Sequence, residues 1–447
     1  MIISTVLSES RPLRFASFTA LYFAQGIPIG LFDIAMPAYL AEQGFSAGQI
    51  GAFVGMVGLP WAFKLVAGPF MDRFRFPAMG LRRPWVLGAQ AGLMLMLAAV
   101  AGVSDPATQW AALLTLAFLV NACAATQDVA VDGMAIDVIP LAERGRANAF
   151  MACGQVVGYG VFGALAGWLL ANFGIAATAL TATAIVAVIF AIALIARERP
   201  GERLLPWGPG AAAATQRAAG RITLLGVFRD VGRALVLPMS VVLSLSIALG
   251  RIATGLILVI LPVFAVNELG FASEQYSSVM GVGSIVAAVL GLLAGPLIDR
   301  FGAKRGLLFG MLGSAASLLV FAGTPGLWDE LGFLFAMLFA VLIFNQVFFI
   351  GCIAESMTLS WPRVAATQFA VYMAVANLAR SGGGWIYGAI GDLFDFQTLF
   401  LVTAGFFVVA VMALVPYDVG RHRRRLDVLE RHRAGTGPGS PAGTPAG

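Results

Sequence analysis

The chain has 447 residues, of which 59% are hydrophobic and only 11% are charged, with a formal net charge of +5. A soluble globular domain carries about 25% charged residues, so this composition excludes an ordinary soluble protein and indicates a chain surrounded by hydrocarbon. The positive charge must then be interpreted by its position along the chain, and no nucleic-acid partner is expected. The three cysteines lie in separate apolar stretches, which predicts neither a disulfide framework nor a metal site.

Long apolar segments recur along almost the whole chain, and each can cross a hydrocarbon core of roughly 30 Å. We therefore predict an all-α polytopic membrane protein. The first six spans are expected at 14–40, 47–71, 84–103, 109–137, 146–171 and 175–196. The second six are expected at 233–264, 274–298, 305–322, 330–358, 363–390 and 396–416. Residues 1–196 and 233–416 then form two six-helix halves.

Two polar segments lie outside these spans. Residues 197–232 are rich in Arg, Pro and Gly and are predicted to be a cytoplasmic linker, with a short interfacial helix as a candidate at 222–228. Residues 417–447 begin with a basic run at 421–425 and end in Gly, Pro and Ser. This composition predicts a disordered basic tail.

The placement of the 28 Lys and Arg residues predicts the orientation. All but Lys64, Arg251 and Arg380 lie in, or at helix ends bordering, the termini, the central linker and the even-numbered connections. The odd-numbered connections contain no basic residue. Because basic residues collect on the cytoplasmic side, both termini are expected in the cytoplasm, which requires an even number of spans.

An internal repeat relates the two halves. The run Gly68-Pro69-Phe70-Met71-Asp72-Arg73-Phe74 matches Gly295-Pro296-Leu297-Ile298-Asp299-Arg300-Phe301, each at the cytoplasmic end of the second span of its half. A weaker match relates 147–150 to 366–369 at the start of each fifth span. Parallel repeats of this kind predict two pseudo-symmetric halves.

The repeated loop is the first candidate functional motif. Asp72 and Asp299 can accept hydrogen bonds from a helix N-terminus or an Arg side chain and so hold the cytoplasmic face closed. The alternative is a loop that is charged only because it faces the cytoplasm. The two matching copies favour a gate. Its predicted residues are Gly68, Asp72, Arg73, Gly295, Asp299 and Arg300.

Charged side chains within the spans are the second candidate. Each costs ~2.5–3.5 kcal/mol at a helix centre, so it normally faces a cavity or a partner. Asn121, Asp128 and Asp132 share one helical face, and two carboxylates four residues apart repel, which favours a proton on one of them. The alternative for Asp128 is a structural ion pair with Lys64. The predicted proton-coupling residues are Asp128, Asp132, Asp33 and Glu355.

Polar side chains in the same spans are predicted to contact a substrate. Gln127 could bind a polar group, and Arg251 and Arg380 could hold an anionic group through paired donors. The predicted substrate-cavity residues are Lys64, Asn121, Gln127, Arg251, Gln368 and Arg380. The sequence leaves open whether Asp33 pairs with Arg251.

Pro and Gly residues predict irregular or closely packed helices. Pro28 and Pro37 are expected to kink the first span, and Pro60 the second. The run 382–384 is expected to loosen the eleventh span. Small residues allow close helix packing in membranes, and the fifth span carries five such glycines: Gly154, Gly158, Gly160, Gly163 and Gly167.

At these residues the sequence resembles the AmpG-like branch of the major facilitator superfamily, the muropeptide permeases and their acetyl-CoA transporter relatives. The matching segments are 25–28, 63–64, 72–73, 82–85, 127–132, Asp137, 143–145, 366–370 and Arg380. The resemblance implies the major facilitator fold and proton-driven import of anhydro-muropeptides across the inner membrane. The chain departs from the family at Asp33, where a small residue is expected, and at Arg251, where an acidic residue is frequent.

Two alternatives remain. A siderophore or another anionic conjugate is the alternative substrate, because exchanging an acid for a base in a cavity can change the substrate class. A non-transporting assembly factor is the alternative of another class, against which the intramembrane charges argue. No nucleophile–base pair, phosphate loop or metal-ligand spacing occurs, so no enzyme activity, cofactor or metal is expected. We expect a monomer whose partners are a small substrate, protons and the lipid bilayer.

Overall fold

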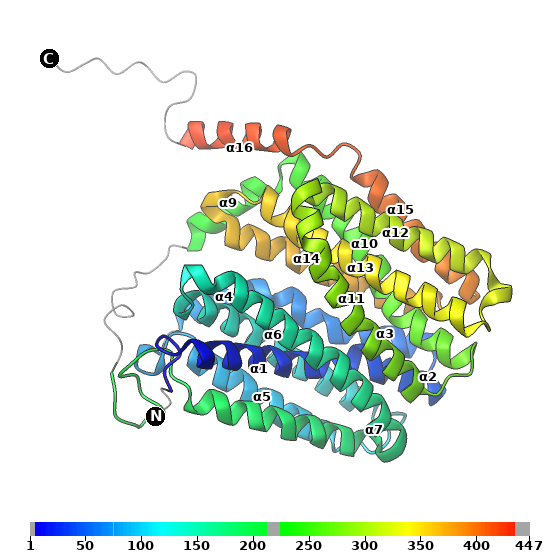
Figure 1. The fold of residues 1–447 in the computed structure, drawn as a ribbon, viewed down its shortest axis with the longest axis horizontal. Helices are drawn as coiled ribbons and strands as arrows, with labels where there is room; N and C mark the ends of the chain where they lie inside the picture. Colours follow the sequence, from blue (N-terminus) through cyan, green and yellow to red (C-terminus); the bar gives the residue numbers. More distant parts are fainter. Residues whose placement is uncertain (1–4, 75, 212–223, 434–447) are drawn as a thin grey trace.

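The computed structural model describes residues 5–74, 76–211 and 224–433. Within these ranges the chain is helical apart from its first residues, the connections between helices, of which 196–211 is a long one, and one isolated β-bridge between Val6 and Arg197. The helices lie side by side, with those of the first half below those of the second half in the view of Figure 1. The halves are therefore separate helical groups joined by the linker.

The first half contains two interrupted helices followed by longer continuous ones. The first span consists of α1 (Arg11–Ile29), a π-helical segment η1 (Gly30–Ala35) and α2 (Met36–Glu42). The second consists of α3 (Ala47–Gly58), a 3-10 segment η2 (Leu59–Phe63) and α4 (Lys64–Arg73). The remaining spans are α5 (Arg83–Val100), α6 (Trp110–Val138) and α7 (Arg144–Ile195).

The second half begins with a short helix, α9 (Leu224–Leu235). Its six spans are α10 (Pro238–Asn267), α11 (Ser273–Phe301), α12 (Ala303–Gly323), α13 (Leu331–Leu359), α14 (Ala365–Ile390) and α15 (Phe396–Ala413). A last helix, α16 (Val419–Arg433), follows them. We call the end of the bundle that carries α9 and α16 the linker end.

The length and composition of the helices account for twelve membrane crossings. Nine helical stretches of the described residues are long and apolar enough to span a membrane. One of them, Arg146–Ile195, turns back at Gly174, whose φ of 76° lies outside the helical region, and so contains two crossings. Helices α11 and α14, with 29 and 26 residues, supply the other two. The predicted twelve-helix, all-α fold is confirmed.

The structure corrects two predictions at the linker end. The seventh span begins at Pro238 and not at 233, because α9 extends to Leu235; residues 222 and 223 of the candidate interfacial helix lie outside the described residues. The tail predicted to be disordered contains α16. Trp361 Nε1 donates to Glu430 Oε1 at 2.6 Å, and Leu426 is buried beside Trp361. One apolar face was thus enough to order a strongly basic segment, while 434–447 lie outside the described residues.

The structure has irregular helical segments at the predicted prolines of the first and second spans, but none at the glycine run of the eleventh span. The π-helical segment lies between Pro28 and Pro37, where the Met36 N–H donates to the Leu31 carbonyl, five residues back. Pro60 lies in the 3-10 segment of the second span. In contrast, α14 runs unbroken through 382–384. A Cβ on Gly383 would lie 2.3 Å from the Ile252 carbonyl oxygen, so this glycine allows close packing instead of loosening the helix.

The glycines of the fifth span allow close packing, as predicted. A Cβ on Gly158 would lie 2.3 Å from the Phe23 carbonyl oxygen, and one on Gly154 would lie 2.3 Å from that of Thr19. At Gly160 the same span approaches Gly281 of the other half, whose carbonyl oxygen would lie 2.6 Å from an added Cβ. The first, fifth and eighth spans, in helices α1, α7 and α11, therefore cross with their backbones in contact.

The two halves pack tightly in the part of the bundle that is distant from the linker end. Ser273 Oγ donates to Glu42, and Asn172 Nδ2 donates to Glu274 Oε2 at 3.1 Å. A Cβ on Gly51 would lie 2.4 Å from the Gly384 carbonyl oxygen, so α3 and α14 are also in backbone contact. These contacts join first-half to second-half helices at the end opposite the linker.

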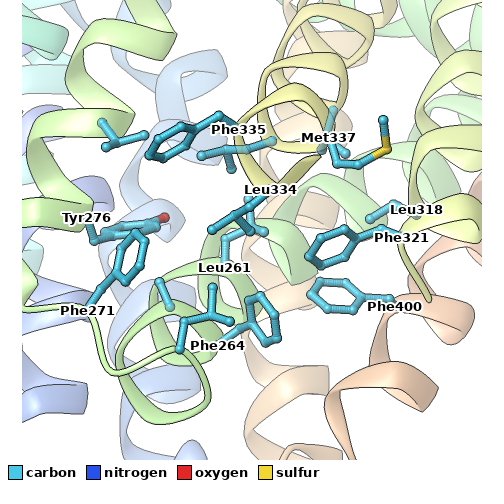
Figure 2. Close-up of a pocket in the computed structure, with 15 residues that line it drawn as sticks. Leu261, Phe264, Phe271, Tyr276, Leu318, Phe321, Leu334, Phe335, Met337 and Phe400 are labelled. Atoms are coloured by element: carbon cyan, nitrogen blue, oxygen red, sulfur yellow. The ribbon is translucent and has the colours of Figure 1, made fainter. Parts of the chain in front are cut away.

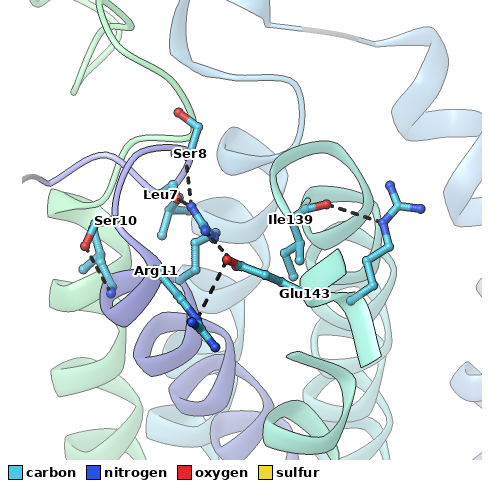
Figure 3. A network of polar contacts seen from close by, with 9 residues as sticks. Leu7, Ser8, Ser10, Arg11, Ile139 and Glu143 are labelled. Carbon is cyan, nitrogen blue, oxygen red and sulfur yellow. Dashed lines mark hydrogen bonds and ion pairs between the residues drawn. The ribbon is translucent and has the colours of Figure 1, made fainter. Parts of the chain in front are cut away.

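Carboxylates fasten the connections of the first half at the linker end. Arg14 Nη2 donates to Glu143 Oε2 at 2.7 Å, and Arg11 Nε lies 3.8 Å from Glu143 Oε1 (Figure 3). The hydrogen bond from Arg14 lowers the pKa of Glu143, which stays ionised at neutral pH. Glu198 accepts the backbone N–H of Arg83 at 2.6 Å, and burial raises its pKa to about 7. These bonds hold the start of the first span and the start of α5 to the ends of neighbouring helices.

Candidate functional site

Polar side chains from the second span and from the fourth span, α6, form the first group. We call it the helix-4 cluster after that fourth span. Lys64 Nζ pairs with Asp128 Oδ2 and lies 4.4 Å from the centre of the Trp61 ring. Trp61 Nε1 donates to Asn121 Oδ1 at 3.1 Å. The ion pair that the sequence left as an alternative is present, and the Trp61 ring fixes the position of its cation.

The two carboxylates of this cluster have different partners. Asp128 is buried with 6% of its surface exposed, whereas Asp132 is exposed and accepts the hydroxyl of Tyr22. Lys64 forms an ion pair with Asp128. A change in the charge of that carboxylate would therefore break the ion pair and release the ammonium group. The contact therefore joins the position of Lys64 to the carboxylate of Asp128. The coupling role itself stays a prediction.

Gln127 is held by the first span. Its side-chain amide is completely buried, and Nε2 donates to the Leu21 carbonyl oxygen at 2.8 Å. Its Oε1 is buried and has no hydrogen-bond partner among the described residues. One acceptor therefore remains for a polar group, which agrees with the predicted substrate role without testing it.

A second group, which we call the inter-half cluster, joins the halves at mid-span. Arg380 Nη1 of α14 lies 2.7 Å from Asp33 Oδ2, which is carried by the π-helical segment of the first span. Asp33 is buried, and only 16% of the Arg380 side chain is exposed. The question left open by the sequence is answered, because the partner of Asp33 is Arg380 and not Arg251.

Arg251 of α10 belongs to the same cluster but has no partner in it. Only 7% of its surface is exposed, and its guanidinium carbon lies 4.9 Å from the centre of the Phe349 ring. Among the described residues it makes no hydrogen bond and no ion pair, and its Nε is buried and unsatisfied. Arg380 and Asp33 both act on it electrostatically. A buried guanidinium whose in-plane N–H donors have no partner is unusual in a protein interior.

Glu355 and Gln368 lie nearer the linker end and are engaged there. The buried carboxylate of Glu355 accepts the hydroxyl of Tyr417, whose carbonyl oxygen accepts from Lys304 Nζ at 2.8 Å. Gln368 Oε1 accepts the Trp361 N–H at 2.8 Å, and Nε2 donates to Tyr372 at 3.0 Å. The structure therefore brings neither side chain into the two central clusters.

The gating motif is only partly described. The side chains of Asp72 and Asp299 and the surroundings of Gly295 are not among the described parts of the chain. Gly68 faces the fourth span, where an added Cβ would lie 3.9 Å from Val129 Cγ1. Arg73 and Arg300 are exposed. The gate therefore stays a prediction.

Sequence reasoning missed several polar partners. Tyr22 accompanies Asp132, Trp61 holds Lys64, and Asn377 Nδ2 donates across the halves to the Trp61 carbonyl oxygen at 3.2 Å. Tyr159 of the fifth span acts electrostatically on both Asp33 and Arg380. Trp61 carried a signal, because it precedes the intramembrane Lys64 by three residues and directly follows Pro60.

A small pocket elsewhere in the second half carries no such chemistry. It has a volume of about 40 Å³ and an apolar lining in which Phe264, Phe321 and Phe400 meet edge to face (Figure 2). The hydroxyl of Tyr276 is the polar group drawn at its edge. An apolar cavity of this kind stays dry, so it is a packing feature of the core and not the candidate site.

Comparisons with known proteins agree with this arrangement. The family model of the Major Facilitator Superfamily matches residues 18–249 and 243–438. The chain is 28% identical over 413 residues to the anhydromuropeptide permease of Escherichia coli (strain K12), covering 90% of this chain and 79% of that protein. It is 22% identical to the putative transporter AmpG 4 of Rickettsia conorii, covering 85% and 90% of the two chains. These relatives confirm the resemblance to the AmpG-like branch.

Solved structures share the fold. The crystal structure of the nucleoside transporter NupG superposes with a TM-score of 0.65 at 15% sequence identity and covers 90% of this chain and 98% of that one. A mutant of the same transporter gives a TM-score of 0.67 over 90% and 99% of the two chains. With two matches that together span both six-helix halves, this chain belongs to the Major Facilitator Superfamily.

Proposed function

We propose that this protein is a secondary active transporter that imports anhydro-muropeptides across the inner membrane together with protons. The observation that carries the substrate is the similarity to the anhydromuropeptide permease over 90% of this chain. Polar clusters on helices of both halves support a transport role, since intramembrane charges are costly to keep in a scaffold.

Proton coupling is assigned to the helix-4 cluster. In the ion pair, the carboxylate of Asp128 holds the ammonium group of Lys64. A proton on Asp128 removes the negative charge, and Lys64 is then free to contact the substrate beside Gln127. When the halves rock and Asp128 loses its proton, Lys64 returns to it. Asp128 is therefore the proton carrier, and Lys64 binds either Asp128 or the substrate according to whether Asp128 carries a proton.

The placement of basic residues and the contacts between the halves support an orientation in the membrane, a conformation and an oligomeric state. The connections 43–46, 101–109, 268–272, 324–330 and 391–395 contain no basic residue, which supports a periplasmic position for them and a cytoplasmic one for both termini. The contacts between halves at that same end, among them Ser273 with Glu42, support a conformation closed toward the periplasm. We take the protein to act as a monomer, since each half contributes to one shared cluster.

Uptake into proteoliposomes tests the proposal. Vesicles that carry the purified protein should accumulate labelled anhydro-muropeptide when the interior is made alkaline, and should only equilibrate without the gradient. A ferric siderophore should neither accumulate nor compete. Uptake of the siderophore without uptake of the muropeptide would show that the substrate is a siderophore. No uptake of either compound would favour a non-transporting assembly factor.

A further inference from the structure

The inter-half cluster contains more positive than negative charge. Two guanidinium groups, Arg251 and Arg380, act on each other electrostatically, and within the described part of the chain Asp33 is the one carboxylate that acts on both. The backbone of Arg380 packs against the next turn of α10, where a Cβ on Gly255 would lie 2.0 Å from the Arg380 carbonyl oxygen. One uncompensated positive charge is thus confined at mid-span, where an ion without a partner is strongly disfavoured.

The free charge belongs to Arg251. Asp33 Oδ2 lies 2.7 Å from Arg380 Nη1, whereas Arg251 makes a cation–π contact with the Phe349 ring and has no hydrogen bond or ion pair among the described residues. A cation–π contact satisfies the face of a guanidinium, and the in-plane N–H donors stay available. A packing role would be better served by an apolar side chain of similar volume, because that replacement removes the desolvation cost. An arginine at this position therefore indicates a ligand that brings an acceptor.

We propose that Arg251 binds one carboxylate of the transported molecule, and that Asp33, by holding Arg380, limits the inter-half cluster to a single anionic group. This inference rests on the proposed function, since the peptide part of a muropeptide ends in a free carboxylate. A planar guanidinium donates two parallel hydrogen bonds to a carboxylate but not to a carboxamide. The bound carboxylate brings the charge of the three side chains to balance.

The Asp33 carboxylate makes the site selective as well as balanced. While Asp33 occupies Arg380, a second substrate carboxylate finds no free guanidinium and is repelled by Asp33. In Asp33→Asn the repulsion is lost and Arg380 is released, so a dianionic ligand gains a second binding group. Arg251 therefore sets the preference for a carboxylate over a carboxamide, and Asp33 sets the number of ligand carboxylates that the cluster binds.

Binding of matched ligands to the purified protein tests this inference. The ligands are an anhydro-muropeptide with one free carboxylate and its carboxamide, and the readouts are affinity and thermal protection. The wild type should prefer the acid by about tenfold or more, the loss expected when a charged hydrogen bond is not made. Arg251→Gln should bind both ligands equally, with the affinity of the wild type for the amide. The control Arg425→Gln, which removes an exposed positive charge on α16, should keep the preference.

The outcomes separate this inference from the proposed function. An unchanged acid preference in Arg251→Gln, or no preference in the wild type, overturns the anion site while muropeptide transport stands. If the wild type binds neither ligand, the proposed substrate is wrong. Without ligand, Arg251→Gln should melt no lower than the wild type, because an unpartnered charge is removed. Should that variant not fold, Arg251→Lys, which keeps the charge but loses the paired donors, should retain a reduced preference, and a full preference there would also overturn the proposal.

Discussion

The ion pair between Asp33 and Arg380 predicts an unequal response to the loss of either partner. Removing one member of a buried pair typically costs ~3–5 kcal/mol, because the other charge is left without compensation. Asp33→Asn leaves two guanidinium groups with no anion, so we expect its cost in that range. Arg380→Gln leaves the Asp33 carboxylate with Arg251, which already acts on it electrostatically. Its cost should be lower, about 1.5–3 kcal/mol, the value for a hydrogen bond to a charged group.

The double variant completes the test. Asp33→Asn with Arg380→Gln contains one buried charge instead of two or three, so it should cost less than the sum of the single variants, with a coupling of about 0.5–3 kcal/mol. Unfolding of the detergent-solubilised protein by denaturant, with Arg425→Gln as the control, measures all three. Equal costs for the single variants would contradict the position of Arg251, and strict additivity would contradict the pair itself.

Three further outcomes are expected. Asp128→Asn should abolish accumulation driven by a pH gradient while weakening substrate binding much less, and Lys64→Ala should shift the pH optimum of uptake; accumulation equal to the wild type in Asp128→Asn would move coupling to another carboxylate. Asp72→Asn combined with Asp299→Asn should slow uptake several-fold while the protein remains folded and inserted, and unchanged uptake would remove the gate. A reporter fused at Ala107 should report the periplasm, opposite to one in the linker, and a cytoplasmic signal there would contradict the twelve-span orientation.

The membrane fold was predictable because it rests on local composition. Each span had to be apolar over its own length, and the turn at Gly174 lies between two spans predicted from their apolar runs. The tail was different. Helix α16 is ordered by Leu426 and by the bond from Trp361 to Glu430. Such a contact joins residues 69 positions apart, and tail composition alone carries no information about it.

The candidate site was predictable in its residues but not in its pairing. The cost of charge in hydrocarbon identified Asp33, Arg251 and Arg380 as functional candidates. Which of the two arginines meets Asp33 depends on the rotation of α10 and α14 and on the wider turn of the π-helical segment. The spacing of charges along the chain does not encode that rotation. For the same reason the run 382–384 was interpreted as flexible, although Gly383 allows α14 to touch α10.

The most direct test of muropeptide–proton cotransport is the flow of protons that accompanies the substrate. Proteoliposomes with a trapped pH-sensitive dye, and with no gradient imposed, should show internal acidification when anhydro-muropeptide is added outside. The signal should vanish in Asp128→Asn and persist in Arg425→Gln. Muropeptide entry with no change of internal pH, or acidification that persists in Asp128→Asn, would contradict proton coupling through the helix-4 cluster.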